Sequence, residues 1–194
     1  MYKRIVFFLL VAMATTGALF SGPRCEAAVS PPAEGEVLPD ISLSVPQETR
    51  ERKYLGVSAG ERFKIPQIKA ELVILEVFNM YCPHCQREAP TVNELHRMIE
   101  GNGEIKRKIK LIGIGAGNSA FEVDIFRKKY DISFPLFIDQ DYSIYNALGK
   151  VGTPYFIVIE MNPDGSHRVI YSKAGSFGNP KDFLDLIRKR AKAK

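Results

Sequence analysis

The chain has 194 residues, of which 45% are hydrophobic and 25% are charged, and it contains 3 Cys and no Trp. This length and apolar fraction suit one globular domain with a short appendage, and they exclude a disordered or collagen-like chain. Three cysteines are too few for a small domain held together by disulfides. The formal net charge of +5 is too small to indicate a nucleic-acid partner.

Residues 1–28 have the pattern of a secretory signal peptide. After two basic residues comes the uncharged, mostly apolar run Ile5–Phe20, and small residues follow at Ala27 and Ala28. The run is shorter than the ~20 residues that a membrane span needs, which favours cleavage near Ala27 or Ala28 over an uncleaved membrane anchor. We therefore expect a periplasmic or otherwise exported protein, from which Cys25 is removed with the signal.

The segment that follows is expected to contribute little regular structure. Residues 29–51 are polar and rich in Pro, and they are interpreted as an extended lead-in with one short strand at Ile41–Val45. Residues 52–194 are assigned to the main domain. At its start, Tyr54–Val57 and Phe63–Ile65 are strand candidates, and the small residues between them predict a hairpin.

Strand and helix patterns alternate along the rest of the chain. Leu72–Phe78 and Ile109–Ile114 are nearly continuous apolar runs, as expected of strands that are covered on both faces. The turn signal at 162–165 predicts that the two strands on either side of it form an antiparallel hairpin. This order predicts an α/β fold with a mixed sheet. The other expected strands are Leu136–Ile138, Tyr155–Glu160 and Arg168–Tyr171, and the expected helices are Pro83–Glu100, Ser119–Tyr130 with Phe121, Ile125 and Phe126 inward, Tyr142–Leu148 and Phe183–Arg190.

The chemistry is expected at Cys82-Pro83-His84-Cys85, directly after a buried strand and at the start of a helix. A thiolate at this position gains hydrogen bonds from free backbone N–H groups and lies at the favourable end of the helix dipole. The two-residue spacing lets the sulfurs close a disulfide within one turn. We interpret Cys82 as the exposed nucleophile and Cys85 as the resolving thiol.

Metal-binding interpretations have less support. A structural zinc site needs a second pair of ligands, and covalent haem needs a His after the second Cys, where Gln86 stands. A metal chaperone that uses the cysteines with His96 or His167 remains an alternative, although both lie among polar neighbours and are expected at the surface. We expect neither a metal nor an organic cofactor, because in dithiol chemistry the electrons stay on sulfur.

The active-site stretch and several residues outside it resemble a known superfamily. The stretch Leu75–Cys85 resembles the active-site segment of the thioredoxin superfamily, and its Cys-Pro-His-Cys is the DsbA form. Pro90 matches the helix-kinking proline of that superfamily, Glu76 its buried acidic residue, and Val151–Pro154 the segment with its cis-proline. The resemblance implies a thioredoxin fold, with a central mixed sheet flanked by helices. It also implies an N-terminal hairpin extension and one strand–helix insertion before Pro154.

The spacing of these landmarks is similar to that of the exported TlpA/ResA-like (redoxin) group. The interval between Cys85 and Pro154 is longer than in thioredoxin and shorter than in DsbA. Peroxiredoxins carry a Thr three residues before the peroxidatic Cys, where this chain has Asn79, so a thiol peroxidase is the second choice. The Pro83-His84 dipeptide departs from the TlpA/ResA pattern and leaves the direction of electron flow open.

The resemblance implies a thiol–disulfide oxidoreductase in which Cys82 forms a mixed disulfide and Cys85 resolves it. Thr153 and Pro154 would present backbone to an extended substrate, and Tyr81 would add an apolar rim. The implied partners are protein thiols or disulfides and a regenerating redox protein in the membrane or periplasm. A monomer is expected.

Two further residues are expected to affect the ionisation of the two cysteine thiols. Glu76 is the one ionisable side chain in the run Leu72–Phe78. Burial should raise its pKa, so that it exchanges a proton with Cys85. His84 is expected, when protonated, to stabilise the Cys82 thiolate.

Overall fold

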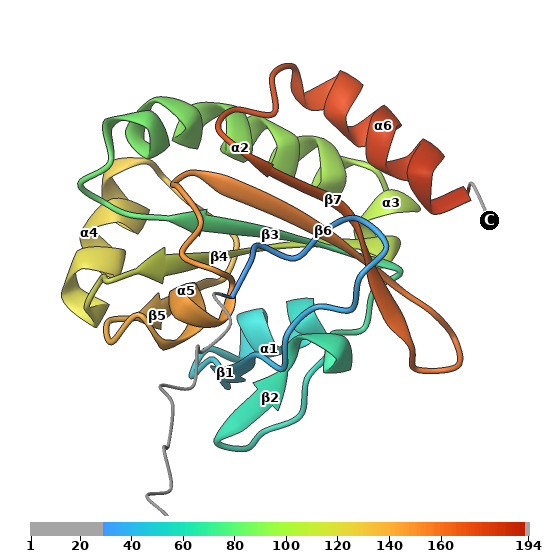
Figure 1. The fold of residues 1–194 in the computed structure, drawn as a ribbon, viewed down its shortest axis with the longest axis horizontal. Coiled ribbons are helices and arrows are strands. Elements are labelled where there is room, and N and C mark those ends of the chain that lie inside the picture. The colour runs from blue at the N-terminus through green and yellow to red at the C-terminus, as the bar shows by residue number, and fades with distance from the viewer. Residues whose placement is uncertain (1–28, 193–194) are drawn as a thin grey trace, which may run out of the picture.

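A five-stranded mixed sheet forms the centre of the protein (Figure 1). The structure is a computed structural model that describes residues 29–192, so the expected signal peptide lies outside the described residues. The strand order is β5-β4-β3-β6-β7, in which β3, β4 and β5 are parallel, β6 is antiparallel to β3, and β7 is antiparallel to β6. The strands are β3 (Leu72–Phe78), β4 (Ile109–Ala116), β5 (Leu136–Asp139), β6 (Tyr155–Met161) and β7 (His167–Ala174).

The two central strands explain the apolar runs of the sequence. Every residue of β3 and β4 is buried, because helices or the N-terminal segment cover both faces of the sheet. Glu76 lies in the middle of β3, opposite Gly113 of β4 and Phe156 of β6. The mixed sheet and the β6–β7 hairpin are confirmed.

Helices cover both faces of the sheet, and each face has its own hydrophobic cluster. In Figure 1, α2 and α6 lie above the sheet, while α1 and the β1–β2 pair lie below it. None of the helices within 29–192 is long and apolar enough to cross a membrane. The helices are α1 (Thr49–Leu55), α2 (Pro83–Gly101), α3 (Ile105–Lys108), α4 (Ala120–Lys129), α5 (Ser143–Ala147) and α6 (Pro180–Lys192), with a 3-10 turn at Ile65–Gln67.

The N-terminal region differs from its prediction. An antiparallel pair is present, but β2 (Arg62–Lys64) pairs with β1 (Ser42–Ser44), and Tyr54–Val57 is not a strand. Helix α1 takes up Tyr54 and ends at Gly56, which is in the left-handed conformation with φ 69°. The extended lead-in predicted at 29–51 therefore contains β1 and the first turn of α1.

Helix α4 lies where it was predicted but is one residue shorter at each end, and its buried face agrees with the prediction only at Phe126. Ser119 caps it by accepting a hydrogen bond from the Glu122 N–H, and the inward side chains are Val123 and Phe126. The prediction that Phe121 points inward is wrong, because its side chain is 71% exposed.

Candidate active site

The two cysteines stand at the start of helix α2, directly after the central strand β3. Cys82 is the N-cap residue, and Pro83 opens the helix, where its missing N–H costs no helical hydrogen bond. Cys82 is partly exposed, whereas Cys85 is fully buried one turn further on. Both are free thiols, and Cys82 Sγ donates a hydrogen bond to the Thr153 carbonyl at 3.1 Å. The Thr153–Pro154 peptide bond beside it is cis.

The two sulfurs differ in their tendency to ionise. Burial alone would raise the pKa of Cys82, but hydrogen bonding lowers it below its ordinary value. The hydrogen bonds that lower it come from the side chain of Thr153, from the backbone and thiol of Cys85 and from the backbone of His84. Burial is the main cause that raises the pKa of Cys85 to about 12, and the charge of Glu76 adds to it. Cys82 therefore ionises first, as an attacking thiol must.

A buried carboxylate lies behind this dithiol. Glu76 is 1% exposed, and its Oε1 has no hydrogen-bond partner among the described residues. Burial raises the pKa of Glu76 to about 8, and repulsion by the Glu88 carboxylate contributes. The raised pKa that was predicted for Glu76 is present, and its physical cause is the predicted one, burial in an apolar strand.

Glu88 is a site residue that the sequence analysis missed. It is buried in α2 and accepts a hydrogen bond at 2.9 Å from Ser176 Oγ, which belongs to the loop after β7. One signal could have found it. Glu88 follows Cys85 by three residues, so the two share a helix face, and the buried Ala89 and Val92 mark that face as internal.

Amide side chains hold the loop between β3 and the dithiol. Asn79 donates from Nδ2 to the Ala116 carbonyl at 2.7 Å and accepts from the Tyr81 N–H at 2.9 Å. The buried Asn118, which the sequence analysis also missed, accepts from the Met80 N–H at 2.9 Å. These bonds fix the approach of the chain to Cys82.

Two exposed side chains flank the cysteines. Tyr81 is 65% exposed, and its hydroxyl donates to Glu122 Oε1 at 2.5 Å, which ties it to the start of α4. The His84 ring lies beside Arg87, with 2.9 Å between His84 Nδ1 and Arg87 Nη2. Because a guanidinium only donates, Nδ1 must accept in this arrangement. His84 therefore reaches Cys82 through its backbone N–H, while its ring is engaged with Arg87.

The two histidines of the metal alternative lie elsewhere. The prediction that His96 is a surface residue is wrong, because it is 5% exposed and its ring lies against those of Tyr54 and Phe134. His167 begins β7 opposite Met161. Among residues 29–192, no three His, Cys, Asp or Glu side chains are grouped so that they could hold a metal ion.

A dithiol at a helix start, beside a cis-prolyl segment and over the end of a mixed five-stranded sheet, defines a thioredoxin-like thiol domain. Residues 35–170 match the AhpC/TSA family, and the chain belongs to this family.

Individual proteins agree with this assignment. The thiol-disulfide oxidoreductase ResA of Halalkalibacterium halodurans is 27% identical over 153 residues, which are 78% of this chain and 82% of that protein. A putative thiol:disulfide interchange protein DsbE from Chlorobium tepidum has a similar structure, with a TM-score of 0.60, 16% identity and coverage of 82% and 99% of the two chains. A secreted disulfide oxidoreductase from Mycobacterium tuberculosis matches with a TM-score of 0.52, 17% identity and coverage of 80% and 96%. The thioredoxin fold and the likeness to ResA confirm the resemblance inferred from the sequence.

Proposed function

We propose that this chain is an exported thiol–disulfide oxidoreductase that exchanges disulfides with protein substrates through Cys82 and Cys85. The proposal rests on a difference between the two cysteine thiols. Cys82 is partly exposed at the start of α2 and has a lowered pKa, while Cys85 is buried one turn away and has a pKa raised to about 12. This asymmetry supports attack by Cys82 and resolution by Cys85. The likeness to ResA supports the same enzyme class.

The reaction is two successive exchanges at sulfur. The Cys82 thiolate attacks one sulfur of a substrate disulfide, forms a mixed disulfide and releases the other substrate sulfur as a thiolate. Cys85 then loses its proton and attacks Cys82, which gives the Cys82–Cys85 disulfide and a second substrate thiolate. Two electrons pass from the enzyme to the substrate, and the reverse sequence oxidises a dithiol. Glu76, with a pKa of about 8, is suited to take up and return the Cys85 proton.

The surroundings of Cys82 suit an extended polypeptide. The Thr153 carbonyl is in contact with Cys82 Sγ, so a substrate strand that pairs with the backbone at Thr153 and Pro154 brings its own sulfur to Cys82. Tyr81 adds an exposed ring at the rim. Export is supported by the signal-peptide pattern of residues 1–28, and the expected partners are protein thiols or disulfides and a regenerating redox protein.

The peroxidase alternative has less support from the site. Asn79 occupies the position of the peroxide-orienting Thr, and both its amide nitrogen and its oxygen are engaged in hydrogen bonds with the backbone. Cys85, one turn from Cys82, instead offers an internal partner for disulfide formation.

The proposal is tested by a redox titration of the purified protein in glutathione buffers. We expect the Cys82 and Cys85 thiols to disappear together in one two-electron transition. A midpoint near that of thioredoxin, about −270 mV, would indicate a reductant, and one near that of DsbA, about −120 mV, an oxidant. Failure to form this disulfide under oxidising conditions would reject the proposal. Hydrogen peroxide consumption faster than that of free cysteine would favour the peroxidase.

A second prediction separates the backbone of His84 from its ring. His84→Pro removes an N–H that stabilises the Cys82 thiolate. The pKa of Cys82 should therefore rise by about one unit or more, since hydrogen bonds to charged groups contribute roughly 1.5–3 kcal/mol. The reduced form loses stability, so the reduction potential should fall. His84→Ala keeps the N–H and should shift the Cys82 pKa less.

The measurement is the pH dependence of the alkylation rate of Cys82, with thermal unfolding as the check on folding. If His84→Ala raises the pKa of Cys82 as much as His84→Pro does, the ring and not the backbone stabilises the thiolate.

A further inference from the structure

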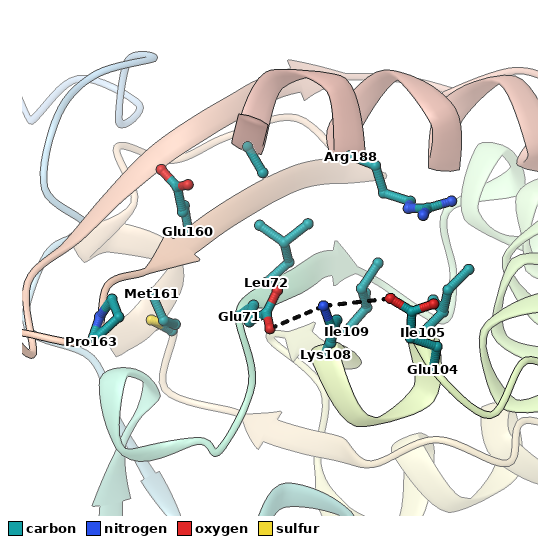
Figure 2. A pocket seen from close by; sticks show the side chains of 11 residues that line it. Glu71, Leu72, Glu104, Ile105, Lys108, Ile109, Glu160, Met161, Pro163 and Arg188 are labelled. Carbon is teal, nitrogen blue, oxygen red and sulfur yellow. Dashed lines mark ion pairs between the residues drawn. The ribbon is translucent and has the colours of Figure 1, made fainter. Parts of the chain in front are cut away.

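Two cavities of about 510 Å³ each lie away from the dithiol, and they differ in how their charges are compensated. Figure 2 shows the first, which lies where β3 and β4 begin, with Arg188 of α6 on its wall. Lys108 lies between Glu71 and Glu104, 3.5 Å from each, and Glu160 pairs with Arg168 at 2.8 Å. The charged side chains of this lining are three carboxylates and two cations, so the first cavity holds no surplus of positive charge.

The second cavity, here called the basic cavity, lies among α1, the C-terminal half of α2, α3 and the start of β4. Its lining includes six cationic side chains, and within residues 29–192 none of the six forms an ion pair. They are Arg50, Lys53, Arg97, Lys106, Arg107 and Lys110.

The two carboxylates in the lining do not neutralise this charge. Glu51 forms its ion pair, at 3.2 Å, with Arg127, which is not part of the lining. Glu100 acts on Lys110 electrostatically, but no ion pair within 4 Å joins them. The basic cavity therefore holds a surplus of positive charge.

Lys110 is the most informative of these cations, because it is only 9% exposed. Its Nζ donates to the Lys106 carbonyl at 2.5 Å and lies 4.3 Å from the centre of the Tyr54 ring. Burial lowers the pKa of Lys110, and repulsion by Lys106 contributes. A buried ammonium group is costly unless an anion accompanies it, and within residues 29–192 no carboxylate lies within 4 Å of Lys110 Nζ.

The pKa of His96 shows that cations of the basic cavity act on the same ring. Its Nδ1 lies 3.1 Å from Ser133 Oγ, and its buried Nε2 has no hydrogen-bond partner among the described residues. Burial lowers the pKa of His96 to about 4, and repulsion by Arg50 and Lys110 adds to this. Two cations from different elements, α1 and β4, therefore act on the same ring, so their fields overlap within the cavity.

We propose that the basic cavity is a binding site for a small anion that carries at least two phosphate groups. One arginine guanidinium group binds two phosphate oxygens at once. The buried Lys110 ammonium group adds a compact positive charge at the wall of the cavity. The volume is in the range of sites for small molecules. Several cations around one cavity are neutralised better by a ligand with two or more phosphate groups than by a ligand with a single negative charge.

This site is separate from the dithiol chemistry. Lys110 stands near the start of β4, whereas Ala116, which accepts from Asn79 beside the cysteines, is its last residue. Six residues of strand separate the two by about 20 Å. The proposal therefore holds whether or not the proposed function is correct.

The test is calorimetric titration of the purified protein with pyrophosphate at low ionic strength, where exposed charges are least screened. The double variant Arg50→Gln/Arg107→Gln removes two exposed guanidinium groups and should bind pyrophosphate about tenfold more weakly or worse. The control Lys173→Gln/Lys189→Gln removes the same net charge from exposed positions that have no ion pair. We expect the control to bind like the unchanged protein.

Vesicles distinguish a lipid headgroup from a soluble phosphate. Sedimentation with cardiolipin-containing vesicles but not with phosphatidylcholine vesicles, lost in the Arg50/Arg107 variant, would identify the source as a lipid, because the cardiolipin headgroup carries two phosphate groups. Pyrophosphate binding without vesicle binding would identify a soluble ligand. Binding to neither probe, or equal weakening by both double variants, would overturn the proposal. Thermal unfolding of each variant shows that it is folded.

Discussion

Replacing Cys82 with Ser is expected to reduce thiol–disulfide exchange by roughly a thousandfold or more, because it removes the attacking sulfur. Replacing Cys85 with Ser should have a different effect. Attack by Cys82 still occurs, but no second thiol follows, so the mixed disulfide with substrate accumulates. The measurement is mass spectrometry of each variant after incubation with a peptide that contains one disulfide.

The different results expected for the two variants follow from a difference between the two sulfurs. Cys82 is partly exposed and has a lowered pKa, while Cys85 is buried and has a pKa raised to about 12. Digestion should place the peptide adduct on Cys82 of the Cys85→Ser variant, and dithiothreitol should release it. Cys82→Ser is the matched control and should carry no adduct. An adduct on Cys85 of that variant would contradict the assignment.

The central elements were predictable because their signals are local. The strands Leu72–Phe78 and Ile109–Ala116 are buried on both faces, so nearly every residue is apolar and the pattern needs no partner to be recognised. Helix α2 begins at Pro83 as predicted, because proline tolerates the first turn of a helix and the motif that precedes it marks the boundary.

Elements that depend on packing were predicted less well. Phe121, Ile125 and Phe126 form the inward face predicted for α4, and only Phe126 of these is fully buried, because the pattern alone could not show that the face is turned toward Val123. The sheet selects Val123 and Phe126, which join the core beside Phe78. Tyr54 has a strand propensity, but the residues before it favour a helix that buries Leu55.

The same distinction applies to the site. The cysteines and Glu76 were identified from a continuous stretch of sequence. The electrostatic effect of Glu88 on Glu76 depends on how α2 packs against β3, and Asn118 reaches Met80 from the loop after β4. His96 has polar neighbours in sequence but lies on the same face of α2 as Val92 and Ile99, which are core residues.

Replacing Glu76 with Gln is expected to stabilise the protein increasingly as the pH rises. The ordinary pKa of this carboxyl is 4.5, and burial raises it to about 8 in the folded protein. Between these values the unfolded chain loses the proton and the folded protein keeps it, so the stability of the unchanged protein falls with rising pH. Each unit of pKa difference corresponds to about 1.4 kcal/mol. The variant should therefore gain roughly 3–5 kcal/mol over the unchanged protein between pH 5 and pH 9.

The measurement is denaturant unfolding of both proteins in the reduced state across this pH range. The cysteines titrate almost alike in the two proteins, so their contribution largely cancels when the two free energies of unfolding are subtracted. Glu94→Gln, which removes an exposed carboxylate from the same helix as the dithiol, is the control and should show no such trend. A difference in stability that does not change with pH would mean that Glu76 is already ionised in the folded protein at pH 5, so that burial does not raise its pKa.

The stability result gains its functional meaning from a rate measured on the same variant. If Glu76 exchanges the Cys85 proton, Glu76→Gln should slow the resolution of the mixed disulfide by about a hundredfold, since a positioned acid or base commonly contributes that much. The attack by Cys82 should change little. A variant that is more stable but resolves as fast as the unchanged protein would show that the buried carboxylate has no part in proton transfer. A variant that is more stable but resolves the mixed disulfide more slowly would show that the buried Glu76 carboxylate, which destabilises the fold, takes part in the chemistry of Cys85.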